Sequence, residues 1–263
     1  MQKLNVFVIG EGKICPELIS SKLLNKLYTT SDTMGNNTIP IPFENIDNLI
    51  KKCKGLQVDI VIVEDFDLLS LGIADILKQN HINCFGANKV WAEILQDDLC
   101  SRKLTNRYRI SKPAILNYPK EFPLIVKADG FTRKAHDLKE LLEIKETIPK
   151  ETENIYLEEY LEGDKIVLTS LFDGKNLLNF PIKNLNERQK SRLGEYTVKL
   201  RTLLQEEKAE FLGFINSELI WHDNNWNHLR FDLGYVKPTK IKHDLLFILT
   251  SAIYQKLDEI NLS

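Results

Sequence analysis

The sequence predicts an α/β fold, in which an N-terminal parallel α/β domain is followed by an α+β domain. Short apolar runs at 4–9, 58–63 and 82–85 alternate with helical patterns, which is the order expected of a parallel sheet. Prolines then interrupt residues 113–123 and favour an extended linker, because a proline pushes its predecessor out of helical geometry. Beyond this linker, apolar runs separated by Asp, Asn and Gly predict β-hairpins.

The N-terminal domain is expected to cover residues 1–112. Its first buried strand is the apolar run Leu4–Ile9. Pro16 fits the first turn of a helix that reaches about Leu27, since a proline there forfeits no intrahelical hydrogen bond. The other elements expected in this domain are a loop over 29–42 and helices over 68–79 and 89–109.

The second domain is expected to cover residues 124–263, with 113–123 as the linker. It begins with an apolar strand over 124–129. A hairpin over 166–182 is expected to turn at Asp173-Gly174, because Asp-Gly is a strong turn signal. The other elements expected here are helices over 135–146, 186–209 and 242–260, a strand over 155–160, and a hairpin of 211–221 with 228–232 that turns around Asp223-Asn-Asn225.

The composition excludes several classes of partner. Lysine and arginine total 35, and aspartate and glutamate total 37, so the net charge of −2 gives no field that draws the chain to nucleic acid or to an anionic membrane. No stretch approaches the roughly 18 apolar residues of a transmembrane helix. The first apolar run is too short for a secretory signal. We therefore expect a cytoplasmic protein that binds a small molecule or a protein partner.

Two segments together have the layout of a nucleotide cleft. The first is Leu124-Ile-Val-Lys-Ala-Asp-Gly130, a strand that ends in a lysine and a turn, and the second is Tyr156-Leu-Glu-Glu-Tyr-Leu-Glu-Gly-Asp164. With Val6-Phe-Val-Ile-Gly-Glu-Gly12 and His81-Ile-Asn-Cys-Phe-Gly86, they resemble the phosphoribosylamine–glycine ligases of the ATP-grasp superfamily in order and rough spacing. The resemblance implies a pre-ATP-grasp-like N-terminal domain followed by a reduced ATP-grasp domain, in a shortened and diverged relative.

The resemblance also implies that ATP lies between two β-layers. Lys127 matches the family's strand lysine that contacts ATP phosphate, and a salt-bridged structural lysine is the alternative. Backbone groups at 158–161 are implied to read adenine, with Asp164 as the carboxylate nearest the ribose position. The solvated end of an ordinary strand is the alternative here. The predicted nucleotide-binding residues are Lys127, Lys134, Glu158, Glu159, Tyr160, Leu161, Asp164 and Arg230.

The phosphate-binding parts of the family pattern are changed in this chain. The family's glycine loop is replaced by Phe131-Thr-Arg-Lys-Ala-His-Asp137, in which Lys134 and its basic neighbours can hold phosphate only by side-chain charge. A basic, exposed turn is the alternative interpretation. The family's second phosphate lysine is missing, because Leu99 or Cys100 takes its place.

The metal and substrate positions also differ from the family pattern. Where the family's L-E-F-N strand holds Mg²⁺, this chain has Leu229-Arg-Phe-Asp232, and an arginine cannot ligate a cation. Asp232 is the remaining candidate metal ligand, while Arg230 itself can neutralise nucleotide phosphate. The candidate residues for a substrate phosphate, which precede a helix N-terminus, are Gly10, Gly12 and Lys13.

These features favour ATP binding and disfavour a Mg²⁺ site. The first functional hypothesis is a relative of a purine-biosynthesis ligase, a pseudoenzyme with weak nucleotide binding and an impaired or lost ligase reaction. The second is an active ATP-dependent carboxylate–amine ligase with a rearranged site, built on Lys127, Lys134, Asp164 and Asp232. The third is a structural or partner-binding protein without a nucleotide site.

Overall fold

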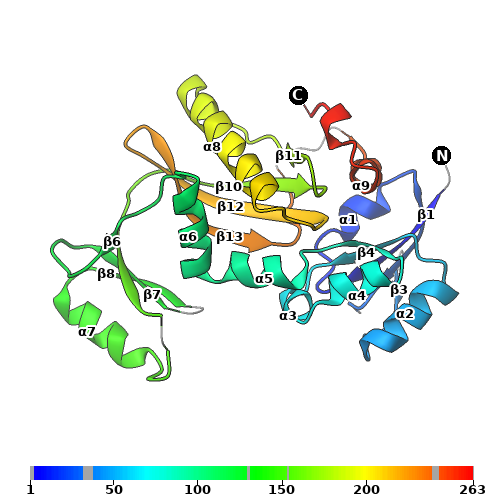
Figure 1. Cartoon of the computed structure of the whole chain (residues 1–263), viewed down its shortest axis with the longest axis horizontal. Helices are drawn as coiled ribbons and strands as arrows, with labels where there is room; N and C mark the ends of the chain where they lie inside the picture. The colour runs from blue at the N-terminus through cyan, green and yellow to red at the C-terminus, as the bar shows by residue number, and fades with distance from the viewer. Residues whose placement is uncertain (1–2, 32–37, 129–130, 153, 239–242, 263) are drawn as a thin grey trace.

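The computed structural model describes residues 3–31, 38–128, 131–152, 154–238 and 243–262, which form three β-sheets flanked by helices (Figure 1). The first sheet has the order β3-β2-β1-β4-β5, and its pairings are parallel. The N-terminal parallel α/β arrangement predicted from the sequence is therefore confirmed. Its strands are β1 (Leu4–Ile9), β2 (Leu24–Thr29), β3 (Ile39–Pro40), β4 (Ile60–Val63) and β5 (Asn83–Phe85).

Most helices around this sheet begin at a residue that caps them. Asn45, Asp65, Asn88 and Asp97 each accept hydrogen bonds from backbone N–H groups of the following turn. These caps fix where the helices start. The helices are α1 (Cys15–Ile19), α2 (Ile46–Gly55), α3 (Phe66–Ser70), α4 (Ile73–Gln79), α5 (Lys89–Gln96) and α6 (Asp98–Arg107).

The prediction of a helix that reaches Leu27 is wrong. The observed helix ends at Ile19, and the chain then forms β2, which buries Leu27 and Tyr28 beside β1. Pairing with β1 satisfies backbone groups that a helix at this position would leave unpaired at the sheet edge. The predicted loop over 29–42 contains the short strand β3, and residues 32–37 of it lie outside the described chain.

Two other predicted helices are each split in two. The helix expected over 68–79 is interrupted at Gly72, whose φ of 84° is left-handed, so α3 and α4 are separate. The helix expected over 89–109 is interrupted at Asp97, whose extended backbone lets its carboxylate cap α6. The consequence is that α6 has its own direction and its own N-terminal turn, which faces the second sheet (Figure 1).

The second sheet is antiparallel and has the order β6-β9-β7-β8. Ile115 pairs with Glu158, so the predicted linker contributes a strand to this sheet. We call residues 115–159 the small lobe. The predicted turn at Asp129-Gly130 lies outside the described residues. The elements of the small lobe are β6 (Ile115–Leu116), β7 (Leu124–Ala128), β8 (Phe131–Ala135), α7 (Leu138–Thr147) and β9 (Tyr156–Glu159).

Residues 131–135 are a strand, not the basic exposed turn offered as an alternative from the sequence. Thr132 lies opposite Lys127 in the β7–β8 ladder. The next helix therefore starts at Leu138 rather than at 135, and Asp137 caps it. β8 is the edge strand of this sheet and, among the described residues, pairs with β7 alone.

The third sheet is antiparallel, with the order β11-β10-β12-β13 and helix α8 across one face (Figure 1). Both predicted hairpins are confirmed, with turns at Asp173-Gly174 and at Asp223-Asn224. The predicted last helix is shorter than expected. No described helix has the length and apolar character needed to cross a membrane. The elements are β10 (Lys165–Phe172), β11 (Leu177–Asn179), α8 (Glu187–Glu206), β12 (Gly213–His222), β13 (Asn225–Leu233), α9 (Leu245–Ile253) and the 3₁₀ turn η1 (Leu257–Glu259).

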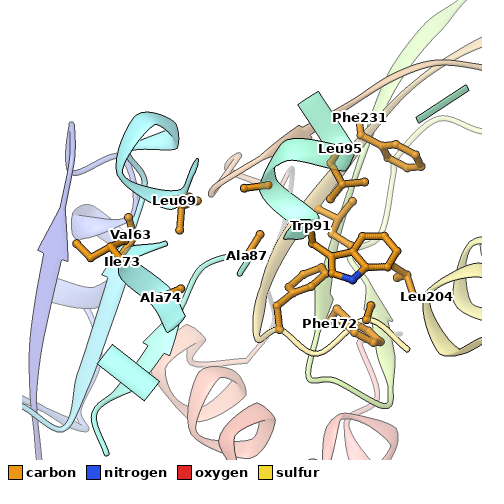
Figure 2. Close-up of a cluster of buried hydrophobic side chains, with 14 of the residues drawn as sticks. Val63, Leu69, Ile73, Ala74, Ala87, Trp91, Leu95, Phe172, Leu204 and Phe231 are labelled. Atoms are coloured by element: carbon orange, nitrogen blue, oxygen red, sulfur yellow. The ribbon is translucent and has the colours of Figure 1, made fainter. Parts of the chain in front are cut away.

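The first and third sheets share their hydrophobic cores, whereas the small lobe has its own. Trp91 of α5 packs against Phe211, with ring centroids 6.0 Å apart, and Phe211 packs against Phe172 of β10 (Figure 2). Gly213 lies so close to Gly86 that an added Cβ would sit 3.2 Å from the Gly86 nitrogen. We call the first and third sheets with their helices the main body. The domain boundaries 1–112 and 124–263 stay a prediction.

Candidate functional site

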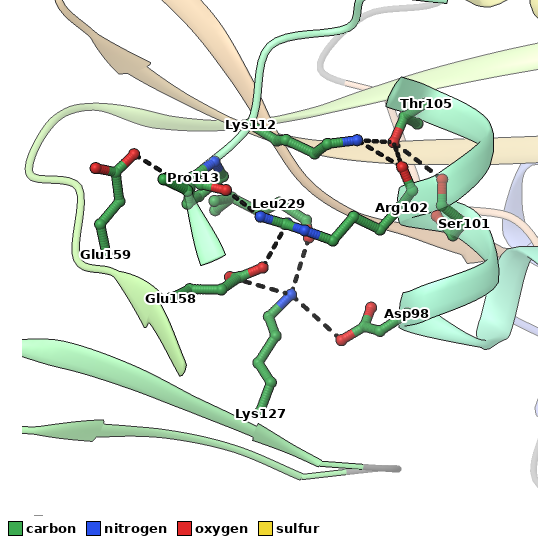
Figure 3. A network of polar contacts seen from close by, with 11 residues as sticks. Asp98, Ser101, Arg102, Thr105, Lys112, Pro113, Lys127, Glu158, Glu159 and Leu229 are labelled. Carbon is green, nitrogen blue, oxygen red and sulfur yellow. Dashed lines mark hydrogen bonds and ion pairs between the residues drawn. The ribbon is translucent and has the colours of Figure 1, made fainter. Parts of the chain in front are cut away.

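Lys127 reaches from β7 of the small lobe to the main body (Figure 3). Its Nζ lies 3.2 Å from Asp98 Oδ2 and 3.5 Å from Glu158 Oε2, and it donates to the carbonyl oxygen of Leu229 at 3.2 Å. The residue is 6% exposed. The ammonium group thus makes one hydrogen bond, to a backbone carbonyl oxygen, and two ion pairs with carboxylates. The strand lysine therefore lies between the second and third sheets.

Glu158 is the buried centre of this cluster. It is 2% exposed, and Arg102 Nη1 lies 2.6 Å from its Oε1. Arg102 Nη2 also donates to the carbonyl oxygen of Pro113. Burial raises the pKa of Glu158, and the opposing charges of Lys127 and Arg102 limit the rise. The two cations together hold this carboxylate in place.

Arg102 is not among the site residues predicted from the sequence. It lies three residues after Leu99, the position at which the family's second phosphate lysine is absent, and therefore one turn further along α6. A cation one helical turn after the position of the missing phosphate lysine is the sequence pattern that could have identified Arg102. Its guanidinium carbon also lies 5.9 Å from the centre of the Tyr156 ring.

A small polar cavity lies behind Lys127. Its volume of about 10 Å³ is comparable to one water molecule, and Lys112, Tyr156 and His228 line it. Lys112 Nζ donates to Arg102 O at 2.6 Å, and burial beside Arg102 lowers the Lys112 pKa to about 8. His228 Nδ1 lies 3.1 Å from Tyr196 Oη, while its Nε2 has no hydrogen-bond partner in the described part of the chain.

His228 is neutral in the folded protein. It is 4% exposed, and burial lowers its pKa to about 3, with further lowering from Lys112, Lys127 and Arg102. A buried imidazolium would add a fourth positive charge to this region. The charged groups of the cluster are therefore three cations, Lys112, Lys127 and Arg102, and two carboxylates, Glu158 and Asp98. The imidazole of His228 adds no charge.

The predicted adenine edge joins the small lobe to the main body. Glu159 Oε1 accepts from Ala114 N at 2.8 Å, and Glu159 N donates to Ala114 O at 3.0 Å. Lys134 Nζ lies 3.8 Å from the centre of the Tyr160 ring, so these two predicted residues are brought together as a cation–π pair. Leu161 is buried, whereas Asp164 is exposed, with its carbonyl oxygen accepting from Trp221 N at 2.8 Å.

Arg230 and Asp232 lie on β13, and Arg230 directly follows Leu229, whose carbonyl oxygen accepts from Lys127. Arg230 faces Glu218 of β12 across the ladder, with Nε 2.8 Å from Glu218 Oε2. Lys165 Nζ lies 3.9 Å from the other oxygen of Glu218. Asp232 is exposed and lies opposite Asn216. Across the described ranges, no group of three His, Cys, Asp or Glu side chains is arranged to hold a metal ion.

The predicted substrate-phosphate residues lie at the carboxyl end of β1. There Glu64, which follows β4, accepts from Lys13 N and Ile14 N at 2.8 Å each. Burial raises the Glu64 pKa, and these backbone donors oppose the rise. A protein carboxylate thus already occupies N–H groups that a phosphate would use. The cavity of about 480 Å³ beside Gly10 is lined by four acidic residues, Glu11, Glu64, Asp65 and Asp67.

A larger cavity lies elsewhere in the molecule. It measures about 750 Å³ and is lined by residues of α4, β5 and the end of α9, including Cys84 and Phe211. It contains none of the predicted site residues. The chemistry suggested by the sequence therefore centres on the polar cluster around Lys127, and the role of each predicted residue there stays a prediction.

Comparison with known proteins identifies the class. The model of the family "Phosphoribosylglycinamide synthetase, N domain" matches residues 4–94. A D-alanine–D-alanine ligase from Bacillus anthracis, solved in complex with ATP, covers 98% of this chain and 98% of its own, with a TM-score of 0.64 at 18% identity. The fold is that of the ATP-grasp ligases.

Within this class, the chain is a diverged relative of phosphoribosylamine–glycine ligase. The ligase of Clostridium acetobutylicum is 21% identical in an alignment of 207 residues that covers 67% of this chain and 50% of that ligase. The crystal structure of the Thermotoga maritima ligase covers 99% of this chain and 77% of its own, with a TM-score of 0.73 at 14% identity. This chain thus spans about half the length of the Clostridium relative.

Proposed function

We propose that the chain binds an adenine nucleotide between the second and third sheets and does not carry out the ligase reaction of its relatives. The observation that supports this best is Lys127. It extends from β7 across to Leu229 of β13, beside the strand that carries Glu158, and a lysine so placed can hold phosphate at the meeting point of the two sheets. The Bacillus neighbour with the same fold was solved with ATP.

The loss of the ligase reaction rests on the phosphate and metal positions. Phosphoryl transfer depends on backbone or cationic groups that hold the phosphates and on carboxylates that place Mg²⁺ across them. In this chain β8 replaces a flexible phosphate loop, and Arg230 pairs with Glu218. An arginine neutralises phosphate charge but does not activate an attacking group as a bound metal does.

The binding proposal is tested by titration calorimetry with ADP and ATP in EDTA. Wild type and Lys139→Ala, an exposed lysine of the same lobe, are expected to bind alike. Lys127→Met removes a charge-assisted hydrogen bond worth about 1.5–3 kcal/mol, so affinity falls roughly tenfold or more. No heat at millimolar nucleotide, or equal binding by Lys127→Met, contradicts the proposal and favours a structural or partner-binding protein.

The reaction is tested separately. Phosphoribosylamine, glycine and MgATP are incubated with the purified chain, and formation of glycinamide ribonucleotide and ADP is followed. We expect no product above the enzyme-free control. Product that requires the chain, and that disappears in Lys127→Met, contradicts the loss of activity and revives the active carboxylate–amine ligase with a rearranged site.

A further inference from the structure

Asp98 differs from the other two partners of Lys127. Glu158 is 2% exposed and fixed by Arg102, and the Leu229 oxygen belongs to the backbone of β13. The side chain of Asp98 is 35% exposed, and its one ion pair among the described residues is with Lys127 Nζ at 3.2 Å. Of the three acceptors around this ammonium group, Asp98 is therefore the one that can move away (Figure 3).

The helix that carries Asp98 does not depend on it for capping. Asp97 accepts from Leu99 N and Cys100 N and so caps α6. The carboxylate of Asp98 adds only the favourable charge of an acidic residue in a first helical turn. Its close approach to Lys127 is thus a feature that helix formation alone does not require.

A carboxylate oxygen and a phosphate oxygen compete for the same ammonium donors. The Lys127 ammonium group makes ion pairs with Asp98 and Glu158 at 3.2 and 3.5 Å and donates to the Leu229 oxygen at 3.2 Å, so an incoming phosphate competes with these partners. We infer that Asp98 is an internal competitor that the nucleotide phosphate displaces from Lys127, and that it thereby sets the affinity of the site. This inference rests on the proposed nucleotide site.

The competition predicts that removing the Asp98 charge strengthens binding. Asp98→Asn keeps the size of the side chain and is expected to bind ADP in EDTA roughly 1.5- to fivefold more tightly than wild type, the range for a partly exposed ion pair. Asp98→Glu keeps the charge and is expected to show no gain. The matched control is Asp47→Asn, an exposed first-turn carboxylate of α2 without an ion pair among the described residues.

Calorimetric titration of the four proteins decides between the outcomes, with circular dichroism used to check that each is folded. Tighter binding by Asp98→Asn alone, with wild type also binding, supports the inference. If wild type binds and Asp98→Asn binds equally or more weakly, the inference is overturned while the proposed function stands. If Asp47→Asn increases the affinity for ADP as much as Asp98→Asn does, the change in net charge explains the effect and the inference is overturned. If no variant binds, the proposed function and this inference both fail.

Discussion

Removing the guanidinium of Arg102 should destabilise the fold strongly. Arg102→Met leaves Glu158, which is 2% exposed, with Lys127 at 3.5 Å as its remaining cation. Breaking a buried pair by deleting one partner costs about 3–5 kcal/mol, because an uncompensated charge remains in the interior. Lys127 neutralises part of that charge, so we expect a loss of about 3 kcal/mol. For a chain of this size, that lowers Tm by roughly 6–12 °C.

The assay is urea denaturation at neutral pH, followed by circular dichroism. Arg107→Met provides the control, because Arg107 lies on the same helix and pairs with Glu207 at the surface, and it should unfold close to wild type. The double variant Arg102→Met with Glu158→Gln removes the stranded charge and should recover at least half of the lost free energy. A single-variant loss below about 1 kcal/mol, or no recovery in the double variant, would refute the reasoning.

Two other predictions concern pH and metal ions. Burial lowers the His228 pKa from its ordinary 6.5 to about 3. Between these two pH values the imidazole is protonated in the unfolded chain but not in the folded chain. The free energy of unfolding should therefore fall as the pH drops from about 6.5 towards 3. His228→Phe should show a shallower decline between those pH values in urea denaturation, and equal slopes would argue against a neutral His228. Nucleotide binding should be largely independent of Mg²⁺, whereas Arg230→Glu should weaken binding in EDTA and make it respond to Mg²⁺. If the wild type binds nucleotide in calorimetry only when Mg²⁺ is present, Arg230 does not take the place of the metal ion.

The fold class was accessible from the sequence because it depends on local patterns. β4 is a continuous apolar run, β1 and β5 are mostly apolar, and the turns at Asp173-Gly174 and Asp223-Asn224 carry strong local signals. β2 was missed because its first half, Leu-Asn-Lys, is polar and follows a helix start. This segment forms a strand because it pairs with β1, and the periodicity of the sequence does not reveal that pairing.

The site was less accessible, because its contacts join residues far apart in the chain. Lys127 could be identified by its strand and motif, but its pairing with Asp98 and Leu229 depends on how the small lobe meets α6 and β13. Likewise Glu64, which follows β4, accepts from the backbone N–H of Lys13, 51 residues away. Such long-range partners follow from topology, and no local pattern marks them.

The shared core of the first and third sheets bears on how the chain matures during synthesis. Trp91, which is 5% exposed in the finished fold, packs on Phe211, a residue made 120 positions later. At a synthesis rate of about 5–20 residues per second, Phe211 is added to the chain roughly 6–24 seconds after Trp91. During this interval the nascent N-terminal half presents an apolar surface on α5 to the ribosome exit environment. Chaperone capture should therefore concentrate on chains that end between these two aromatic residues.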